Sequence, residues 1–187
     1  MKKELIEQYE VNPHTLMIIP IIEEEQVSSE IIEMDCQFLS HERPLKIIKR
    51  ACEYFGSDYA GRRRGTQQLV NITHKAPIIV DPHTSIYFFP TTSPTKPQCI
   101  WVAHDHVVSY RKGDVNHQTI VTFQNNEEYL IPISYTSFGT QLSRTATLRI
   151  KYQQNIERME MYERQVRQSS FFASEKRKPY RTKDRKR

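Results

Sequence analysis

Glycine and cysteine are scarce in this chain, and it has no long apolar run. Only 5 of the 187 residues are glycine, and no glycine-rich phosphate-binding loop of the Walker or Rossmann type is present. The 3 cysteines are far apart, which argues against a disulfide framework and favours a reducing cytoplasm. No stretch approaches the roughly 18 apolar residues of a membrane span, and the N-terminus lacks a signal-peptide pattern. We therefore expect a cytoplasmic protein with no membrane partner.

Charge is divided unevenly along the chain. Residues 1–60 carry 6 Lys or Arg against 12 Asp or Glu, whereas residues 61–174 carry 13 against 8 and residues 175–187 carry 8 against 2. A basic tail added for solubility would explain the last segment but not the middle one. The basic excess after residue 60 therefore indicates a polyanionic partner.

Short β-branched and aromatic runs predict a series of strands. The predicted strands are 15–19, 29–38, 75–80, 85–89, 99–108, 117–123 and 128–134. Pro20 is expected to end the first of them. Asp81-Pro82 and Gln124-Asn125-Asn126 predict the turns of two hairpins, so we expect an antiparallel sheet. Residues 1–13 show no regular pattern and are expected to be loosely ordered.

Two helices complete the predicted fold. Pro44 opens an early helix over 44–55, which Gly56 caps, with an apolar face of Leu45, Ile48, Cys52 and Phe55. A long helix over 138–168 carries an apolar stripe of Leu142, Ala146, Ile156, Met159 and Val166. Arg144, Lys151 and Arg158 recur every seven residues on one side of it, a spacing that suits a phosphate backbone or a solvated face. The sequence thus predicts one α+β domain over 1–168 and a disordered basic tail over 169–187.

Three consecutive arginines, Arg62 to Arg64, stand between Gly61 and Gly65. Since glycine tolerates positive φ, the sequence predicts a pliant loop that presents three fixed positive charges. Such a loop suits the minor groove of A/T-rich DNA, which is narrow and strongly negative. A solvated loop tip is the alternative. No helix-turn-helix, zinc-finger or basic-zipper pattern is present.

The cluster most typical of an enzyme or metal site is His104-Asp105-His106. In a strand both imidazoles would face one side, where Cys99 and His74 are further candidate ligands. No C-x-x-C or H-E-x-x-H motif accompanies them, so we predict no catalytic residue, cofactor or metal. A metal-dependent hydrolase built on His74, His104 and His106 is the alternative function. A regulatory adaptor whose acidic N-terminal part binds a basic protein is a third.

Several segments match a known family in order and spacing, over roughly residues 8 to 155. They are Ser57-Asp-Tyr-Ala-Gly-Arg62, His74-Lys-Ala-Pro-Ile-Ile-Val-Asp-Pro82, Phe88-Phe-Pro-Thr91, Pro97-Gln-Cys-Ile-Trp101 with His104-x-His106-Val107, and Pro132-Ile-Ser-Tyr135 through Arg144-Thr-Ala-x-Leu-Arg149. Together they resemble the ComK family, the competence transcription factors of low-GC Gram-positive bacteria.

The resemblance implies a cytoplasmic, nucleoid-associated activator of DNA-uptake genes without enzymatic activity. Family members bind paired A-rich and T-rich boxes through the minor groove, as dimers that pair into tetramers. RNA polymerase and an adaptor of Clp proteolysis are the other implied partners. The segment associated with adaptor recognition has no clear counterpart here, Phe171-Phe172 being the nearest. The candidate DNA-binding residues are Arg62, Arg63, Arg64, Gly65, Thr66, Lys75, Arg144, Arg149 and Lys151.

Overall fold

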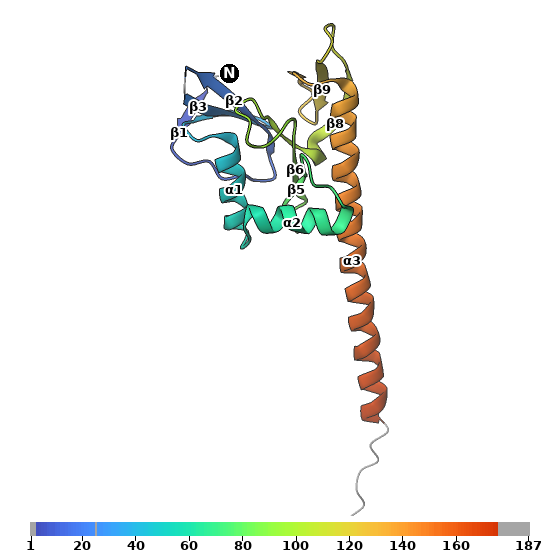
Figure 1. The fold of residues 1–187 in the computed structure, drawn as a ribbon. Coiled ribbons are helices and arrows are strands. Elements are labelled where there is room, and N and C mark those ends of the chain that lie inside the picture. The colour runs from blue at the N-terminus through green and yellow to red at the C-terminus, as the bar shows by residue number, and fades with distance from the viewer. Residues whose placement is uncertain (1–2, 25, 176–187) are drawn as a thin grey trace, which may run out of the picture. The chain divides into compact units, whose positions relative to one another are not determined.

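A computed structural model describes residues 3–24 and 26–175, with side chains up to residue 167. Its contacts divide the chain into two units, Met1–Ile150 and Lys151–Arg187. The first unit combines two sheets with helices α1, α2 and the beginning of α3 (Figure 1). The described part of the second unit is the continuation of α3 to Glu175. The predicted α+β class is confirmed.

The larger sheet has seven strands in the order β1-β4-β3-β2-β7-β6-β5. Their bounds are β1 Glu4–Ile6, β2 Thr15–Glu23, β3 Gln26–Glu33, β4 Gln37–Ser40, β5 Ile78–Asp81, β6 Ile86–Pro90 and β7 Trp101–Ala103. All neighbours are antiparallel except β1 and β4, so the sheet is mixed at one edge. Strand β1 corrects the expectation that residues 1–13 are loosely ordered, because Leu5 pairs with Leu39 across this edge.

Strand β2 also corrects the expectation that Pro20 ends the first strand. Pro20 pairs with Ser29 in the β2–β3 ladder, and the strand continues to Glu23. On its other side β2 pairs with β7 only at Met17 and Ile18. At Pro20, the side of β2 that faces away from β3 does not pair with β7. The missing N–H of Pro20 therefore removes no hydrogen bond from the sheet.

The smaller sheet is antiparallel, in the order β10-β9-β8. It comprises β8 Val107–Lys112, β9 Thr119–Phe123 and β10 Glu128–Ile131, so the hairpin predicted around residues 124–126 is confirmed. The single strand expected over 99–108 is wrong. Strand β7 ends at Ala103, and a 3-10 turn, η1 His104–His106, leads into β8, which pairs with β9 in the smaller sheet.

Helix α1 (Pro44–Tyr54) confirms the early helix. Pro44 lies in its first turn, and Gly56 has a φ of 70° beyond its end, with its N–H donating to the Glu53 carbonyl. Ile48 and Cys52 are buried, as the apolar spacing predicts. This face packs on one side of the larger sheet, in a cluster with Ile18, Ile31 and Trp101, among others.

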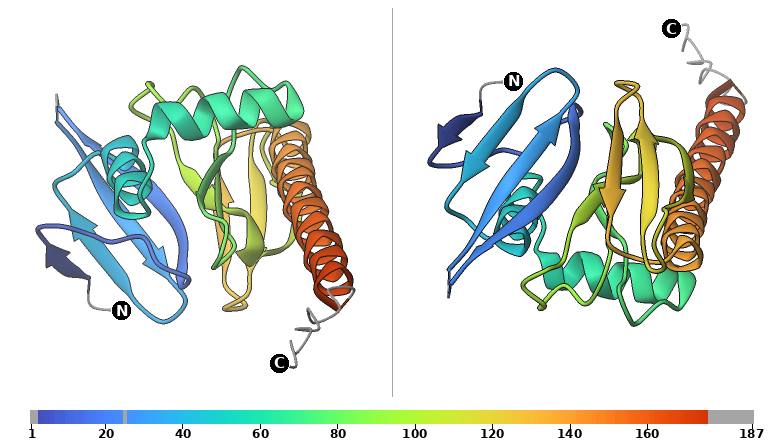
Figure 2. Two further views of the ribbon diagram at one scale, coloured as in Figure 1. Left: turned by 90° about the horizontal axis from the view of Figure 1, so that it is seen from below. Right: turned by 90° about the horizontal axis from the view of Figure 1, so that it is seen from above.

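A second apolar cluster lies between the larger sheet, the smaller sheet and the beginning of α3. Figure 2 shows the backbone of these elements from two further directions. Met17, Phe89 and Val102 of the larger sheet meet Phe123 of β9 and Phe138 of α3 in the cluster. The larger sheet is thus covered on both faces. This arrangement fixes α1 and α2 on one side and holds the beginning of α3 on the other.

Helix α3 (Tyr135–Glu175) confirms the late helix and extends it into the segment predicted as a tail. Phe138, Gln141, Thr145 and Leu148 are its buried residues in the first unit, whereas Ile156, Met159 and Val166 of the expected apolar stripe are exposed. The rest of the predicted tail, residues 176–187, lies outside the described residues. Among the residues that the structure describes, no helix is long and apolar enough to cross a membrane.

The turn between β5 and β6 provides a test at low pH. The Asp81 carboxylate accepts hydrogen bonds from the amides of His83 and Thr84, at 3.1 and 3.0 Å, and from the Thr84 hydroxyl at 2.5 Å. Burial alone would raise the pKa of Asp81, but these bonds lower it below 3.8. The stability that the carboxylate contributes is therefore complete above pH 3.8 and is lost as the pH falls through the lower, folded-state pKa. We expect Asp81→Asn to cost about 1–2 kcal/mol at pH 7 in urea unfolding. If Asp81→Asn lowers the free energy of unfolding equally in strong acid and at pH 7, the lost stability does not come from the ionised carboxylate.

Candidate nucleic-acid interface

The three arginines lie on a helix, α2 (Tyr59–Val70), and the predicted loop is wrong. Asp58 caps its N-terminus, where the carboxylate accepts a hydrogen bond from the Gly61 amide at 2.6 Å. Asn71 closes the other end in a left-handed conformation. Each glycine costs an isolated helix about 1 kcal/mol relative to alanine. The two caps and the contacts of the inner face offset that cost, so the glycines do not make this segment a loop.

The inner face of α2, which packs on the rest of the domain, is formed by residues three and four positions apart. Tyr59 packs edge-on against the ring of Trp101, with centroids 6.2 Å apart. Arg62 donates from Nη2 to the Val80 carbonyl at 3.3 Å, and its Nε is buried. The Thr66 hydroxyl is buried and donates to the Pro77 carbonyl at 2.8 Å. Arg62 and Thr66, both candidate DNA-binding residues, therefore hold the helix on the domain.

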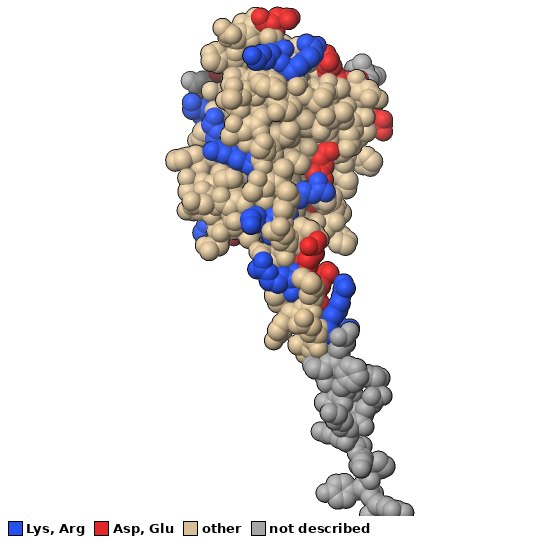
Figure 3. Space-filling view, turned by 90° about the vertical axis from the view of Figure 1, so that its right-hand side faces the viewer, with Lys and Arg blue, Asp and Glu red and all other residues tan. Residues whose placement is uncertain are grey.

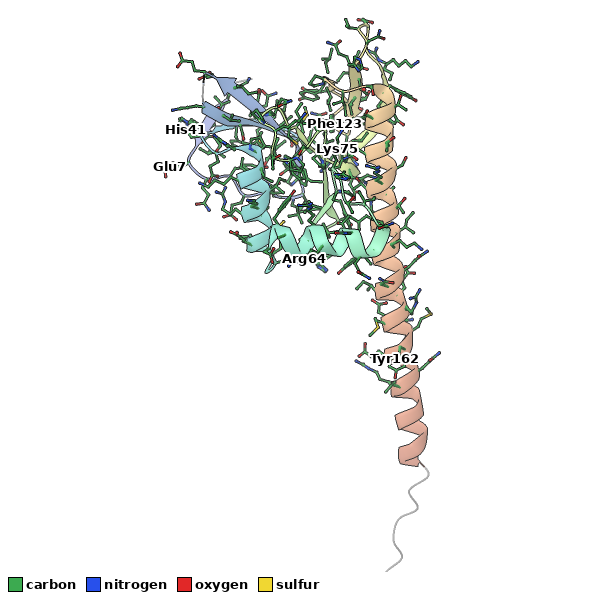
Figure 4. All side chains as sticks on the ribbon, viewed as in Figure 1. Glu7, His41, Arg64, Lys75, Phe123 and Tyr162 are labelled. Atoms are coloured by element: carbon green, nitrogen blue, oxygen red, sulfur yellow. The ribbon has the colours of Figure 1, made fainter. Side chains whose placement is uncertain are left out.

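The outer face of α2 is exposed and carries positive charge and side-chain amides. We call this surface the α2 face; its exposed side chains are Ala60, Arg63, Arg64, Gln67, Gln68 and Asn71. It has no acidic residue, and Gly65 lies half-buried beside it. Figure 4 labels Arg64 on this helix. Arginine and side-chain amides are donors to phosphate and base edges, so this face has the chemistry of a nucleic-acid contact.

A groove of about 460 Å³ begins beside Arg63 and continues to α1. Lys49, Lys75 and Arg63 line it, so cationic side chains from three chain segments converge there, and His74 lies beside them. Asp58 and Glu53 also line the groove, which makes its charge mixed. Lys75 is exposed and has a φ of 49°, and its carbonyl accepts from Gln141 of α3 at 2.9 Å. The structure thus brings Lys75 close to Arg63, as a DNA-binding surface requires.

The candidate residues on α3 lie apart from this groove. Arg149 forms an ion pair with Asp105 at 2.5 Å and lies over the Tyr87 ring, so its charge is already matched within the domain. Arg144 is half-buried, and its Nη1 is 3.3 Å from Oε1 of Gln141. Lys151 is exposed and belongs to the second unit. Figure 3 shows the face that carries α3, where basic side chains are scattered among uncharged and acidic ones and do not form one patch.

The histidine cluster does not support the metal-dependent hydrolase. His104 Nδ1 lies 2.9 Å from the Asp105 carboxylate, and His106 Nε2 lies 2.8 Å from the Pro13 carbonyl. Both occupy the 3-10 turn, so the shared strand face that would direct both imidazoles to one ion does not exist. His74 lines the groove by α1 instead. Among the described side chains, those of residues 3–24 and 26–167, no three from histidine, cysteine, aspartate or glutamate are placed to hold a metal ion.

The three cysteines are not suited to redox chemistry. Burial raises the pKa of Cys36, Cys52 and Cys99 to about 11, and the Glu33 carboxylate adds to this effect at Cys36. Roughly one thiol in a thousand is then ionised at pH 8, and only the thiolate reacts. We expect a thiol reagent such as dithionitrobenzoate to label the folded protein at least 10-fold more slowly than the unfolded chain. Fast labelling of one thiol in the folded protein would contradict this.

The amide side chains of the α2 face and Lys49 were not predicted from the sequence. Gln67, Gln68 and Asn71 follow Arg64 at helical spacing, a signal that becomes readable once Asp58 is recognised as a helix N-cap. Lys49 was not singled out because only the packing of α1 beside α2 brings it to the groove. The candidate surface is therefore a helix face with a neighbouring groove.

Comparison with known proteins agrees with the family resemblance of the segments. The family model described as ComK protein matches residues 6–157. The competence transcription factor of Bacillus subtilis (strain 168) is 45% identical over 152 residues, which cover 81% of this chain and 79% of that protein. No solved structure matches the chain. The match includes all of α2 and the groove beside it, and we conclude that this chain belongs to the ComK protein family.

Proposed function

We propose that this protein is a transcription factor that activates competence genes by binding A/T-rich double-stranded DNA with the α2 face. The observation that carries the proposal is the exposed pair Arg63 and Arg64 on a helix that Asp58, Arg62 and Thr66 hold in place. A similar protein that covers most of the chain is named a competence transcription factor. We propose no catalytic role and no cofactor.

The helical geometry restricts how arginines reach the DNA. An α-helix with its side chains is about 10–12 Å wide, whereas the minor groove is about 6 Å wide. Helix α2 therefore cannot enter that groove, but the long side chains of Arg63 and Arg64 can extend into it from a helix lying across the phosphates. A/T-rich sequence favours this, because its narrow groove concentrates negative potential. Lys75 and Lys49 of the neighbouring groove are then placed for the flanking phosphates.

The proposal extends to the partners of the active complex. Two protomers on paired A-rich and T-rich boxes would add selectivity, since minor-groove contacts distinguish A·T from G·C but little else. The complex would then contact RNA polymerase at the nucleoid. We also propose that an adaptor of Clp proteolysis controls its level, with Phe171-Phe172 as the nearest candidate segment.

A competition experiment tests the proposal. We expect the protein to shift an A/T-rich duplex in a gel in the presence of excess mixed-sequence competitor. Distamycin, which occupies the minor groove, should displace it, whereas methylation of guanine N7 in the major groove should have little effect. Equal binding to both duplexes would refute A/T selectivity. Sensitivity to guanine methylation but not to distamycin would place the contacts in the major groove.

A further inference from the structure

The end of α2 and the beginning of α3 flank a second groove, of about 510 Å³. Figures 1 and 2 show these parts of the two helices side by side. Val70 and Ile72 line the groove at the end of α2, and hydroxyl side chains that include Ser143 and Thr147 line it on α3. We call it the α2–α3 groove. Arg144 is the one charged residue among the described residues that line it, so its charge is not mixed like that of the groove beside α1.

Arg144 is held in place by an amide and not by a carboxylate. Its Nη1 donates to Oε1 of Gln141 at 3.3 Å. Among the described side chains, no carboxylate lies within ion-pair distance of Arg144, whereas Asp105 matches the charge of Arg149. A guanidinium keeps its positive charge and has five N–H donors. Arg144 therefore presents an unmatched charge to the α2–α3 groove, with donors beyond the one that Gln141 accepts.

The amide of Gln141 is fixed in its orientation toward Arg144. Gln141 is 3% exposed, and its Nε2 donates to the carbonyls of Lys75 and Pro90 at 2.9 and 2.7 Å. Since carbonyls only accept, the amide nitrogen must face them and the amide oxygen must face Arg144. The bond to Lys75 also fixes the main chain of a cation that lines the groove beside α1, which Figure 4 labels. One buried amide thus positions a cation in each groove.

The two grooves lie at opposite ends of α2, with Arg63 and Arg64 near its middle. The helix has 12 residues and is about 18 Å long, whereas the minor groove is about 6 Å wide. A helix that crosses the minor groove therefore reaches the phosphates of both strands. We propose that Arg144, positioned by Gln141, binds a phosphate of one strand in the α2–α3 groove, across the minor groove from the strand that Lys75 contacts. This inference rests on the proposed function, and it adds a second strand to the contact.

A double-mutant cycle between the protein and an A/T-rich duplex tests this contact. A methylphosphonate, which replaces one charged phosphate by a neutral group, is moved along both strands. We expect Arg144→Ala to weaken binding about 5-fold at 0.15 M salt and to lower the salt slope by about 0.9. At one position, on the strand opposite the position that couples to Lys75→Ala, the methylphosphonate should cost this variant no further affinity.

The control for net charge is Lys112→Ala on β8, where Lys112 is exposed. At the phosphate that couples to Arg144, it should lose the same further affinity as the unchanged protein. If the losses from Arg144→Ala and from the methylphosphonate add at every position, Arg144 contacts no phosphate and the inference is overturned.

Gln141→Met tests the positioning role, because methionine fills a similar volume but cannot bond to Arg144 or to the two carbonyls. We expect the coupling between Arg144 and its phosphate to disappear in this background. Thr145→Val is the matched control, since Thr145 is also buried and its hydroxyl donates to the main-chain carbonyl of Gln141 at 2.7 Å. Both variants should lower the melting temperature, but Thr145→Val should keep the coupling. Equal coupling in the two backgrounds would mean that Gln141 stabilises the fold without positioning Arg144.

Failure of the inference can be told apart from failure of the proposed function. If Arg63 and Arg64 couple to phosphates and Arg144 does not, the inference is wrong and the α2 face still binds DNA. If none of the three couples, both are wrong. If Arg144→Ala leaves the DNA affinity unchanged but abolishes activation of RNA polymerase in vitro, the α2–α3 groove takes a carboxylate of a protein partner, and the phosphate contact is wrong.

Discussion

Replacing Arg63 and Arg64 together by alanine is expected to weaken binding to an A/T-rich duplex roughly 30-fold at 0.15 M salt. Each neutralised phosphate contributes about 0.9 to the slope of log K against log salt concentration. Two arginines therefore account for a slope of about 1.8, which the double variant should lose. A pliant loop presenting all three arginines would account for about 2.7. The difference arises because Arg62 lies on the inner face of α2 and donates to Val80.

Fluorescence anisotropy over a series of salt concentrations measures this slope. The control is Arg111→Ala with Lys112→Ala, which removes the same charge from β8. If both double variants lower the affinity and the salt slope equally, binding depends only on the net charge of the protein, and the α2 face is not the specific contact with DNA. Arg62→Ala serves as a second control. It should lower the melting temperature, whereas Arg64→Ala should leave it unchanged.

Phe138→Ala is expected to lower the free energy of unfolding by about 3–5 kcal/mol. Phe138 is fully buried at the beginning of α3, and its ring contacts Phe89 edge-on at 5.5 Å and Tyr110 at 5.2 Å. Those two residues belong to different sheets, so the side chain joins both sheets to the helix. Its removal loses the buried apolar area, leaves a cavity and breaks two aromatic contacts.

Urea unfolding followed by circular dichroism measures the loss. Tyr135→Ala is the matched control, because Tyr135 stacks on the same Tyr110 but is 39% exposed. We expect it to cost less than about 1 kcal/mol. If Phe138→Ala costs no more than the control, the second apolar cluster does not hold the two sheets together as described.

The helices and strands that were predicted correctly are those whose sequence signals lie within the element itself. Helix α1 has its proline, apolar spacing and capping Gly56 within one segment, and the hairpins have their turn residues between apolar runs. Pro20 was misjudged because the lack of a partner on one side of β2 depends on how far β7 extends. The break at His104 likewise depends on where the smaller sheet begins, which no residue of that segment specifies.

Helix α2 was missed because its stabilising contacts are distant in sequence. Its two glycines are poor local evidence for a helix, while Trp101, Val80 and Pro77 supply the surface that holds it. The types of residue at the proposed interface were nevertheless recognisable as candidate phosphate ligands. The sequence alone did not distinguish Arg62 and Thr66 from Arg63 and Arg64, because the distinction depends on which face of the helix packs against the domain.

Photo-cross-linking from the α2 face tests most directly whether this helix contacts DNA. Gln68→Cys, carrying a benzophenone on the new thiol, puts the probe on the α2 face without removing an arginine, and we expect the native thiols to react more slowly than the new one. Ser109→Cys on the exposed surface of β8 is the control. We predict adducts with an A/T-rich duplex from position 68, lost on addition of distamycin, and none from position 109. Adducts from position 109 alone would contradict the assignment of α2 as the DNA-binding helix.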